Sequence, residues 1–183
     1  LPHLNRILEG VVMPLFDFGF KVGYSVRTVA EAVAEANKSM QSKTAFLEAR
    51  LITGQEKLFA KFQKAVVSKC VEGREDAYLA ARLEDQMERR RKYGDSATMQ
   101  EPNVKNGCGG LRDLQHLLWM AWFKHRTRTL ADLEQRGFVA AAERRQLTQA
   151  HDFLLRTRTE LHFQQARASD VLAKAVQPAV AHA

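Results

Sequence analysis

Proline is almost absent from this chain, and its absence constrains the fold more than any other sequence feature. It occurs only at positions 2, 14, 102 and 178 of the 183 residues, so long stretches contain no obligatory helix break. Within these stretches, apolar residues recur every three or four positions, as on a helix that buries one face. The clearest stripes are Leu58, Phe59, Phe62 and Val66, and later Leu147, Leu154 and Leu161. The pattern predicts a mainly α protein built as a helical bundle.

Capping residues and glycines predict where the helices begin and end. Thr28 and Thr129 precede helical patterns, whereas Gly54, Gly94 and Gly137 follow them. The predicted helices cover residues 4–18, 28–36, 44–53, 56–71, 75–93, 110–125, 130–136 and 140–166. Residues 177–183 are expected to form a frayed tail.

A single strand is predicted after the first helix. Residues 20–22 and 24–27 alternate apolar and polar side chains with the period of a strand. Because one strand is not stable alone and the chain offers it no neighbour, the strand is a first indication that the chain is part of a larger fold. Ser25 and Arg27 lie at the end of this strand, where they could contact a ligand. Alternatively, Ser25 and Thr28 only cap the following helix, and Arg27 forms an ion pair on the surface.

The loop at residues 96–109 leads into the most distinctive stretch of the chain, Glu101 to Asp113. Gly107, Gly109 and Gly110 place three glycines within four positions, which allows a sharp turn or a close backbone approach to a ligand. The helix expected from Gly110 offers free N–H groups and the positive end of its dipole. Lys105 and Arg112 lie on either side of this terminus, so the stretch predicts a phosphate site.

The net charge of +7 suggests an anionic partner, or else basic residues that only decorate solvated helix faces. The densest basic run, residues 88–92, follows acidic residues on the same helix and is interpreted as a solvated face. The surplus alone does not predict nucleic-acid binding.

Several classes of protein are excluded by the sequence. No apolar run approaches the roughly 18 residues needed to cross a bilayer, so no membrane association is expected. Cys70 and Cys108 are isolated, which matches neither a disulfide framework nor a zinc site and favours a cytoplasmic location. The adjacent His151 and Asp152 diverge on a helix, so they are not interpreted as metal ligands.

Several segments resemble one bacterial family. These are residues 17–28, 44–51, 93–95, 101–105, 107–115, 152–154 and 161–162. They are similar to segments of the uridylyltransferase/uridylyl-removing enzymes, which modify the PII nitrogen-signalling protein. The resemblance implies that residues 1–28 are the C-terminal remnant, a helix plus one strand, of an α+β nucleotidyltransferase domain. It also implies that residues 29–176 are the helical domain that follows and form the helical wall of the nucleotide cleft.

The family's activity is transfer of UMP from UTP to a tyrosine of the PII protein, with Mg²⁺ held by a D-x-D pair. This chain has no such pair on a strand, so the resemblance implies no catalytic and no metal residues here and no activity of the segment alone. The expected nucleotide contacts are Ser25, Arg27, Asn103, Lys105, Gly107, Gly109, Gly110 and Arg112, with Ser25 and Arg27 facing the same cleft as the loop. Glu101 and Asp113 are expected to shape the loop.

Other interpretations stay open at this point. The loop could instead hold the helical domain against the sheet, with Arg112 paired to Asp113 or Glu101. The chain could also be a non-catalytic helical module that binds a protein or nucleic-acid partner through its basic surface. A third possibility is a regulatory piece that binds nucleotide without turnover.

Overall fold

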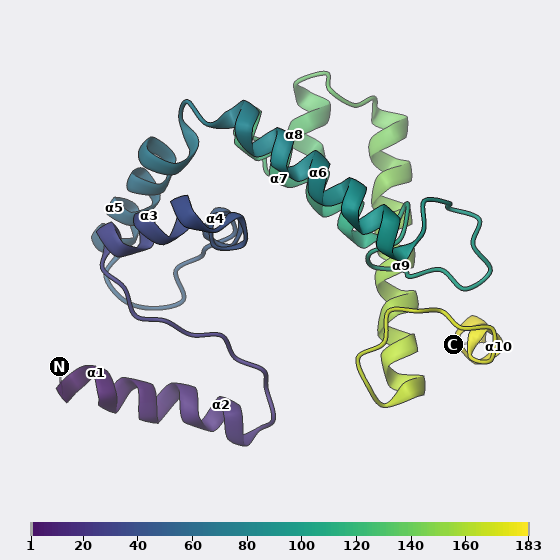
Figure 1. Cartoon of the computed structure of the whole chain (residues 1–183), viewed down its shortest axis with the longest axis horizontal. Coiled ribbons are helices and arrows are strands. Elements are labelled where there is room, and N and C mark those ends of the chain that lie inside the picture. Colours follow the sequence, from purple (N-terminus) through teal and green to yellow (C-terminus); the bar gives the residue numbers. More distant parts are fainter. Residues whose placement is uncertain (1, 183) are drawn as a thin grey trace.

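The computed structural model describes residues 2–182, with side chains from residue 5 onward, and is mainly α as predicted. The elements run in the order α1 Pro2–Ile7, η1 Leu8–Val12, α2 Met13–Asp17, α3 Val29–Lys38, α4 Met40–Leu47, α5 Glu56–Val66, η2 Val67–Val71, α6 Glu75–Tyr93, α7 Leu111–His125, α8 Leu130–Gln135, α9 Ala141–Gln165 and α10 Gln177–Ala181. The two η elements are π-helical turns. Figure 1 shows α6 and α7 running alongside each other at the centre, between the α3–α5 group and the long α9.

The predicted strand at residues 20–27 does not form. Residues 20–28 belong to no helix or strand, and in the described part of the chain the only β pairing is an isolated antiparallel bridge between Asn103 and Val171. An extended segment needs a neighbouring strand to accept and donate its backbone hydrogen bonds, and none of residues 2–182 supplies one. Figure 1 shows this segment as a long connection between the α1–α2 rod and α3.

The core joins the α3–α5 group to α6 and α7. Its buried residues are Ala36, Leu47, Val66, Cys70, Val71, Tyr78, Trp122 and Phe123. Tyr78 of α6 stacks on Phe123 of α7, with ring centroids 3.8 Å apart and an angle of 5° between the rings. The Tyr78 hydroxyl lies 3.0 Å from the hydroxyl of Thr44 on α4, so a hydrogen bond continues the core contact between the two groups of helices.

Helix bounds follow the local signals except where distant contacts intervene. α6 has the predicted bounds, but the helix expected at residues 44–53 is α4, which begins at Met40 and ends at Leu47. The Arg128 guanidinium donates to the Leu47 carbonyl at 2.7 Å. This hydrogen bond replaces the one that the carbonyl would accept from a backbone amide if the helix continued, so α4 can end here. The predicted helix at 56–71 is α5 continued by the π turn η2.

The tail is a second correction, because residues expected to fray form α10. The Gln177 side-chain amide donates to the carbonyls of Gln100, at 2.7 Å, and Leu172, at 3.0 Å. These bonds fix the start of α10 against the loop that precedes α7, a long-range contact that the local sequence does not reveal. Leu1 and Ala183 lie outside the described residues.

Thr28→Ala is expected to lower the free energy of unfolding by about 1 kcal/mol. Thr28 caps α3 as predicted: its hydroxyl accepts from the Glu31 amide at 3.3 Å, and the Glu31 carboxylate accepts from the Thr28 amide at 2.7 Å. Urea unfolding measures the loss. Thr148→Ala is the matched control, because that exposed hydroxyl only bonds to a carbonyl within α9. Equal losses in the two variants would contradict the capping role.

Candidate functional site

The loop before α7 is held by its own backbone and by Asn103. The Asn103 side-chain oxygen accepts from the amides of Lys105, at 3.2 Å, and Asn106, at 2.7 Å. The Gly107 amide donates to the Asn103 carbonyl at 2.9 Å. Asn103, a predicted nucleotide contact, is therefore engaged in shaping this turn.

Glycine is required at the three glycine positions of the loop for different structural reasons. A Cβ on Gly107 would lie 2.7 Å from the Asn103 carbonyl oxygen. A Cβ on Gly110 would lie 2.9 Å from the carbonyl oxygens of both Val104 and Lys105. Gly109 has a φ of +74°, a conformation that other residues rarely adopt. Two glycines thus permit close backbone packing, and the third permits the turn.

The start of α7 is closed to an anion by its own loop. Leu111 and Arg112 donate their amides to the carbonyls of Val104, at 3.0 Å, and Lys105, at 2.8 Å. The Gly110 amide donates to the Gly107 carbonyl at 3.0 Å, and the Gly109 amide donates to the Asp113 carboxylate at 2.9 Å. The amides of Gly107, Gly109 and Gly110, which were expected to face a phosphate, therefore have partners within the chain.

The C-terminal segment holds the other side of the loop. The Lys105 ammonium lies 3.9 Å from the carboxylate of Asp170, which also pairs with Arg158 at 2.6 Å. The Glu101 carboxylate accepts from the Lys174 amide at 2.7 Å. Lys105 is thus directed towards Asp170, and Glu101 has a loop-shaping contact.

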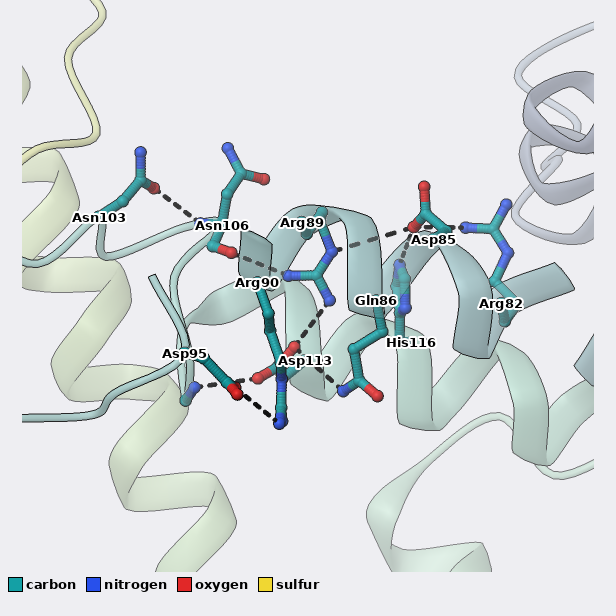
Figure 2. A network of polar contacts seen from close by, with 11 residues as sticks. Arg82, Asp85, Gln86, Arg89, Arg90, Asp95, Asn103, Asn106, Asp113 and His116 are labelled. Atoms are coloured by element: carbon teal, nitrogen blue, oxygen red, sulfur yellow. Dashed lines mark hydrogen bonds and ion pairs between the residues drawn. The ribbon is translucent and has the colours of Figure 1, made fainter. Parts of the chain in front are cut away.

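Arg89 of α6 connects that helix to the loop and to α7 (Figure 2). Its guanidinium donates to the Asp113 carboxylate at 2.7 Å and to the Asn106 carbonyl at 3.0 Å. Burial would raise the pKa of Asp113, but hydrogen bonds from Arg89 and the Gly109 amide hold it below its usual value. The alternative pairing of Arg112 with Asp113 or Glu101 does not occur. Both carboxylates contact other groups.

Arg112 instead lines a pocket of about 560 Å³ between α4, α6, α7 and the loop. The pocket also contains Arg82, Asp85, Arg89, His116 and Trp119. Asp85 lies 3.9 Å from both Arg82 and Arg89, whereas Arg112 forms no ion pair with any carboxylate of the described residues. Arg112 is thus the pocket arginine without an ion pair, and Asp85 and Glu48 act on its charge only from a greater distance.

Trp119 positions two of these arginines. The guanidinium carbons of Arg82 and Arg112 lie 5.2 Å and 5.4 Å from the centroid of its ring, within the range of cation–π attraction. The indole N–H donates at 2.6 Å to the carboxylate of Glu48, the residue directly after α4. The tryptophan is therefore fixed from the end of α4 and holds guanidinium groups from both α6 and α7.

His116 reports on the electrostatics of the pocket. It is 1% exposed, and its Nε2 lies 3.1 Å from the Asp85 carboxylate (Figure 2), although the angle is outside hydrogen-bond geometry. Burial, followed by the charges of Arg89 and Arg82, lowers the pKa of His116 to about 4. The pKa of Arg112 is also lowered, first by burial and then by Arg89. Positive potential therefore prevails beside His116 despite Asp85.

Ser25 and Arg27 lie elsewhere. They line a separate pocket of about 990 Å³ that also contains Phe46 and Phe59 and shares no lining residue with the Arg112 pocket. Arg27 donates to the Ser25 hydroxyl at 2.8 Å, and both side chains are exposed. The expectation that they face the same cleft as the loop is not met.

Apart from Arg112, the residues of this pocket were absent from the sequence-based site, among them Arg82, Arg89, His116 and Trp119. Arg89 belongs to the run interpreted as a solvated face, yet its side chain is only 10% exposed. The sequence does carry a signal for these residues. Arg82 and Arg89 are seven positions apart on α6, and Arg112, His116 and Trp119 follow at steps of four and three on α7.

The described residues do not fit a magnesium site, since they bring together no group of three potential His, Cys, Asp or Glu ligands. Nor does any helix in the described range combine the length and apolar character that crossing a membrane requires.

The fold and the site together define a helical protein with an arginine-lined pocket. Residues 77–183 match the family described as GlnD PII-uridylyltransferase, and the chain belongs to this family. The chain is similar to the bifunctional uridylyltransferase/uridylyl-removing enzyme of Rhodopseudomonas palustris, with 39% identity over 168 residues, which cover 92% of this chain and 18% of that enzyme. The enzyme of the same name from Bradyrhizobium sp. strain ORS 278 is 36% identical over 177 residues, covering 97% of the chain and 19% of the enzyme. The chain thus spans about a fifth of the length of these relatives. No solved structure matches it.

Proposed function

We propose that this chain forms the helical wall of the nucleotide cleft in a uridylyltransferase that transfers UMP from UTP to a tyrosine of a PII signalling protein. The observation that carries the proposal is Arg112, a pocket guanidinium that forms no ion pair with a carboxylate of the described residues. A partly buried cation without a partner favours an anionic ligand, and a nucleotide supplies one. Family membership supports a uridine nucleotide as the ligand and the PII protein as the acceptor.

In this proposal the chain contributes binding groups and no reacting group. Arg112 binds the negative charge of the nucleotide, and Trp119 and Glu48 hold its side chain in place. Magnesium, when bound, supplies neutralisation of phosphate charge in the parent enzyme. The described residues bring together no group of three potential metal ligands, so no step through the metal is assigned to this chain. A role in nitrogen regulation and a cytoplasmic location belong to the same proposal, and two free cysteines are compatible with that location.

Arg112→Ala is expected to lower kcat/KM for UTP about tenfold or more, as expected for loss of one charge-assisted hydrogen bond to the substrate. The measurement uses the Rhodopseudomonas palustris enzyme with its matching segment replaced by this chain, and follows uridylyl transfer to the PII protein. The change is not expected to unfold the chain, because Arg112 forms no ion pair there.

Arg145→Ala is the matched control, since Arg145 is an exposed arginine on α9, outside the Arg112 pocket. It is expected to leave transfer unchanged. Full activity of the Arg112→Ala enzyme, or an equal loss in both variants, would remove the basis for a nucleotide-facing Arg112.

A further inference from the structure

We infer that the Arg112 pocket binds the phosphate chain of the nucleotide and not its base. The phosphate-binding pair is Arg82 and Arg112, whose guanidinium groups both lie against Trp119. This inference rests on the proposed function and assigns a part of the nucleotide to a named set of side chains. The ligand chemistry is a polyphosphate, and its source is a nucleoside triphosphate.

The first argument is the set of buried nitrogen atoms without partners. Arg82 is 5% exposed, and its Nε has no hydrogen-bond partner among the residues whose side chains are described. The Nε of Arg89 and both ring nitrogens of His116 also have no hydrogen-bond partner among the described residues, and one of the two nitrogens of the neutral imidazole is a donor. Buried donors without partners are rare in folded proteins, and each is costly. Their concentration around one pocket favours a ligand rich in acceptor oxygens, as a phosphate chain is.

The second argument is the way the pocket uses its aromatic surface. Two guanidinium groups lie against the Trp119 ring, so the indole serves to position arginines. The Arg82 guanidinium also lies over the ring of Tyr78, 5.4 Å from its centroid, which fixes it from a second side. Guanidiniums held in advance lose little freedom when they bind a planar or tetrahedral oxyanion. A base that required stacking on Trp119 would have to displace them.

The third argument is the state of the carboxylates. Glu48 accepts from the Trp119 indole, and Asp85 lies between Arg82 and Arg89. Glu88 is exposed, as is Lys92 one helical turn further along α6. Arg112 forms no ion pair with a carboxylate of the described residues, although Asp85 and Glu48 act on its charge from a greater distance. The lowered pKa of His116 fits a positive potential on the inner side of the pocket. An anion is therefore attracted despite the acidic residues at the rim.

Calorimetric titration of the 183-residue chain with inorganic tripolyphosphate tests the inference. We expect tripolyphosphate to bind and to compete with UTP, pyrophosphate and phosphate to bind progressively more weakly, and uridine not to compete. Arg112→Ala should weaken tripolyphosphate binding about tenfold, and Arg112→Lys should weaken it less. Arg145→Ala, the exposed arginine control, should bind like the wild type.

The outcomes separate this inference from the proposed function. If UTP binds through Arg112 but uridine competes and tripolyphosphate does not, the base occupies the pocket and the inference is overturned, while the nucleotide cleft stands. Equal binding of tripolyphosphate by wild type and Arg112→Ala also overturns it, because the anion then binds elsewhere. If tripolyphosphate binding depends on Arg112 but transfer by the chimeric enzyme does not, the phosphate site stands and the proposed function fails.

Discussion

Gly110→Ala is expected to lower the free energy of unfolding by about 3–4 kcal/mol, the largest effect of any single methyl group that we consider. The added Cβ would lie 2.9 Å from the carbonyl oxygens of both Val104 and Lys105. These carbonyls accept the amides of Leu111 and Arg112, so moving them away also weakens the two hydrogen bonds that begin α7. The backbone φ of Gly110 is −78°, so the loss is caused by the overlap and not by a strained conformation.

Urea unfolding followed by circular dichroism measures this loss, and two other glycines provide controls. Gly109→Ala meets no atom within 4 Å but places alanine at a φ of +74°, so a smaller loss of about 1–2 kcal/mol is expected. Gly10→Ala, in the helical η1 and free of contacts, should stabilise slightly. If Gly110→Ala is no worse than Gly109→Ala, close packing is not the reason for glycine at position 110.

Local signals predicted the helices well where the cause is local. Thr28 and Thr129 cap α3 and α8 with the reciprocal hydrogen bonds of a capping box, both readable from a threonine followed three residues later by an acid. The prediction of a strand at residues 20–27 was wrong for a non-local reason. Alternation of apolar and polar residues does not show whether a partner strand is present. The early end of α4 likewise depends on Arg128, 81 positions from Leu47 in the sequence.

The site was also predictable only where its features are local in the sequence. The glycines and Arg112 mark an unusual loop in the sequence, and the structure places Arg112 in a pocket. Whether the loop amides are free depends on which carbonyls fold back onto them, and the sequence does not show that the Val104 and Lys105 carbonyls do so. Arg89 resembles its exposed neighbours in sequence, and only the packing of α6 against α7 distinguishes it. The spacing of residues along a helix shows which of them share a face, but it does not show which other helix packs against that face.

Stability is expected to fall by up to about 3 kcal/mol as the pH is lowered from 6.5 to about 4, because of His116. Its pKa in the folded protein is about 4, against an ordinary value of 6.5, first because of burial and then because of Arg89 and Arg82. Below pH 6.5 the unfolded chain therefore takes up a proton that the folded chain does not, and this favours unfolding. Asp85 on α6 opposes the shift and Arg112 on α7 adds to it, so both are included in this expectation.

Urea unfolding of wild type and His116→Gln at several pH values between 7 and 4.5 measures this contribution, since the variant should lose the part of the slope that His116 causes. Asp113 and Asp170 have pKa values below their usual 3.8, so their stabilising contributions are lost only at lower pH. His182→Gln, which changes an exposed imidazole at the end of α10, should keep the wild-type slope. A wild-type slope in His116→Gln would mean that His116 is protonated in the folded protein, and the positive potential assigned to the pocket would then be wrong.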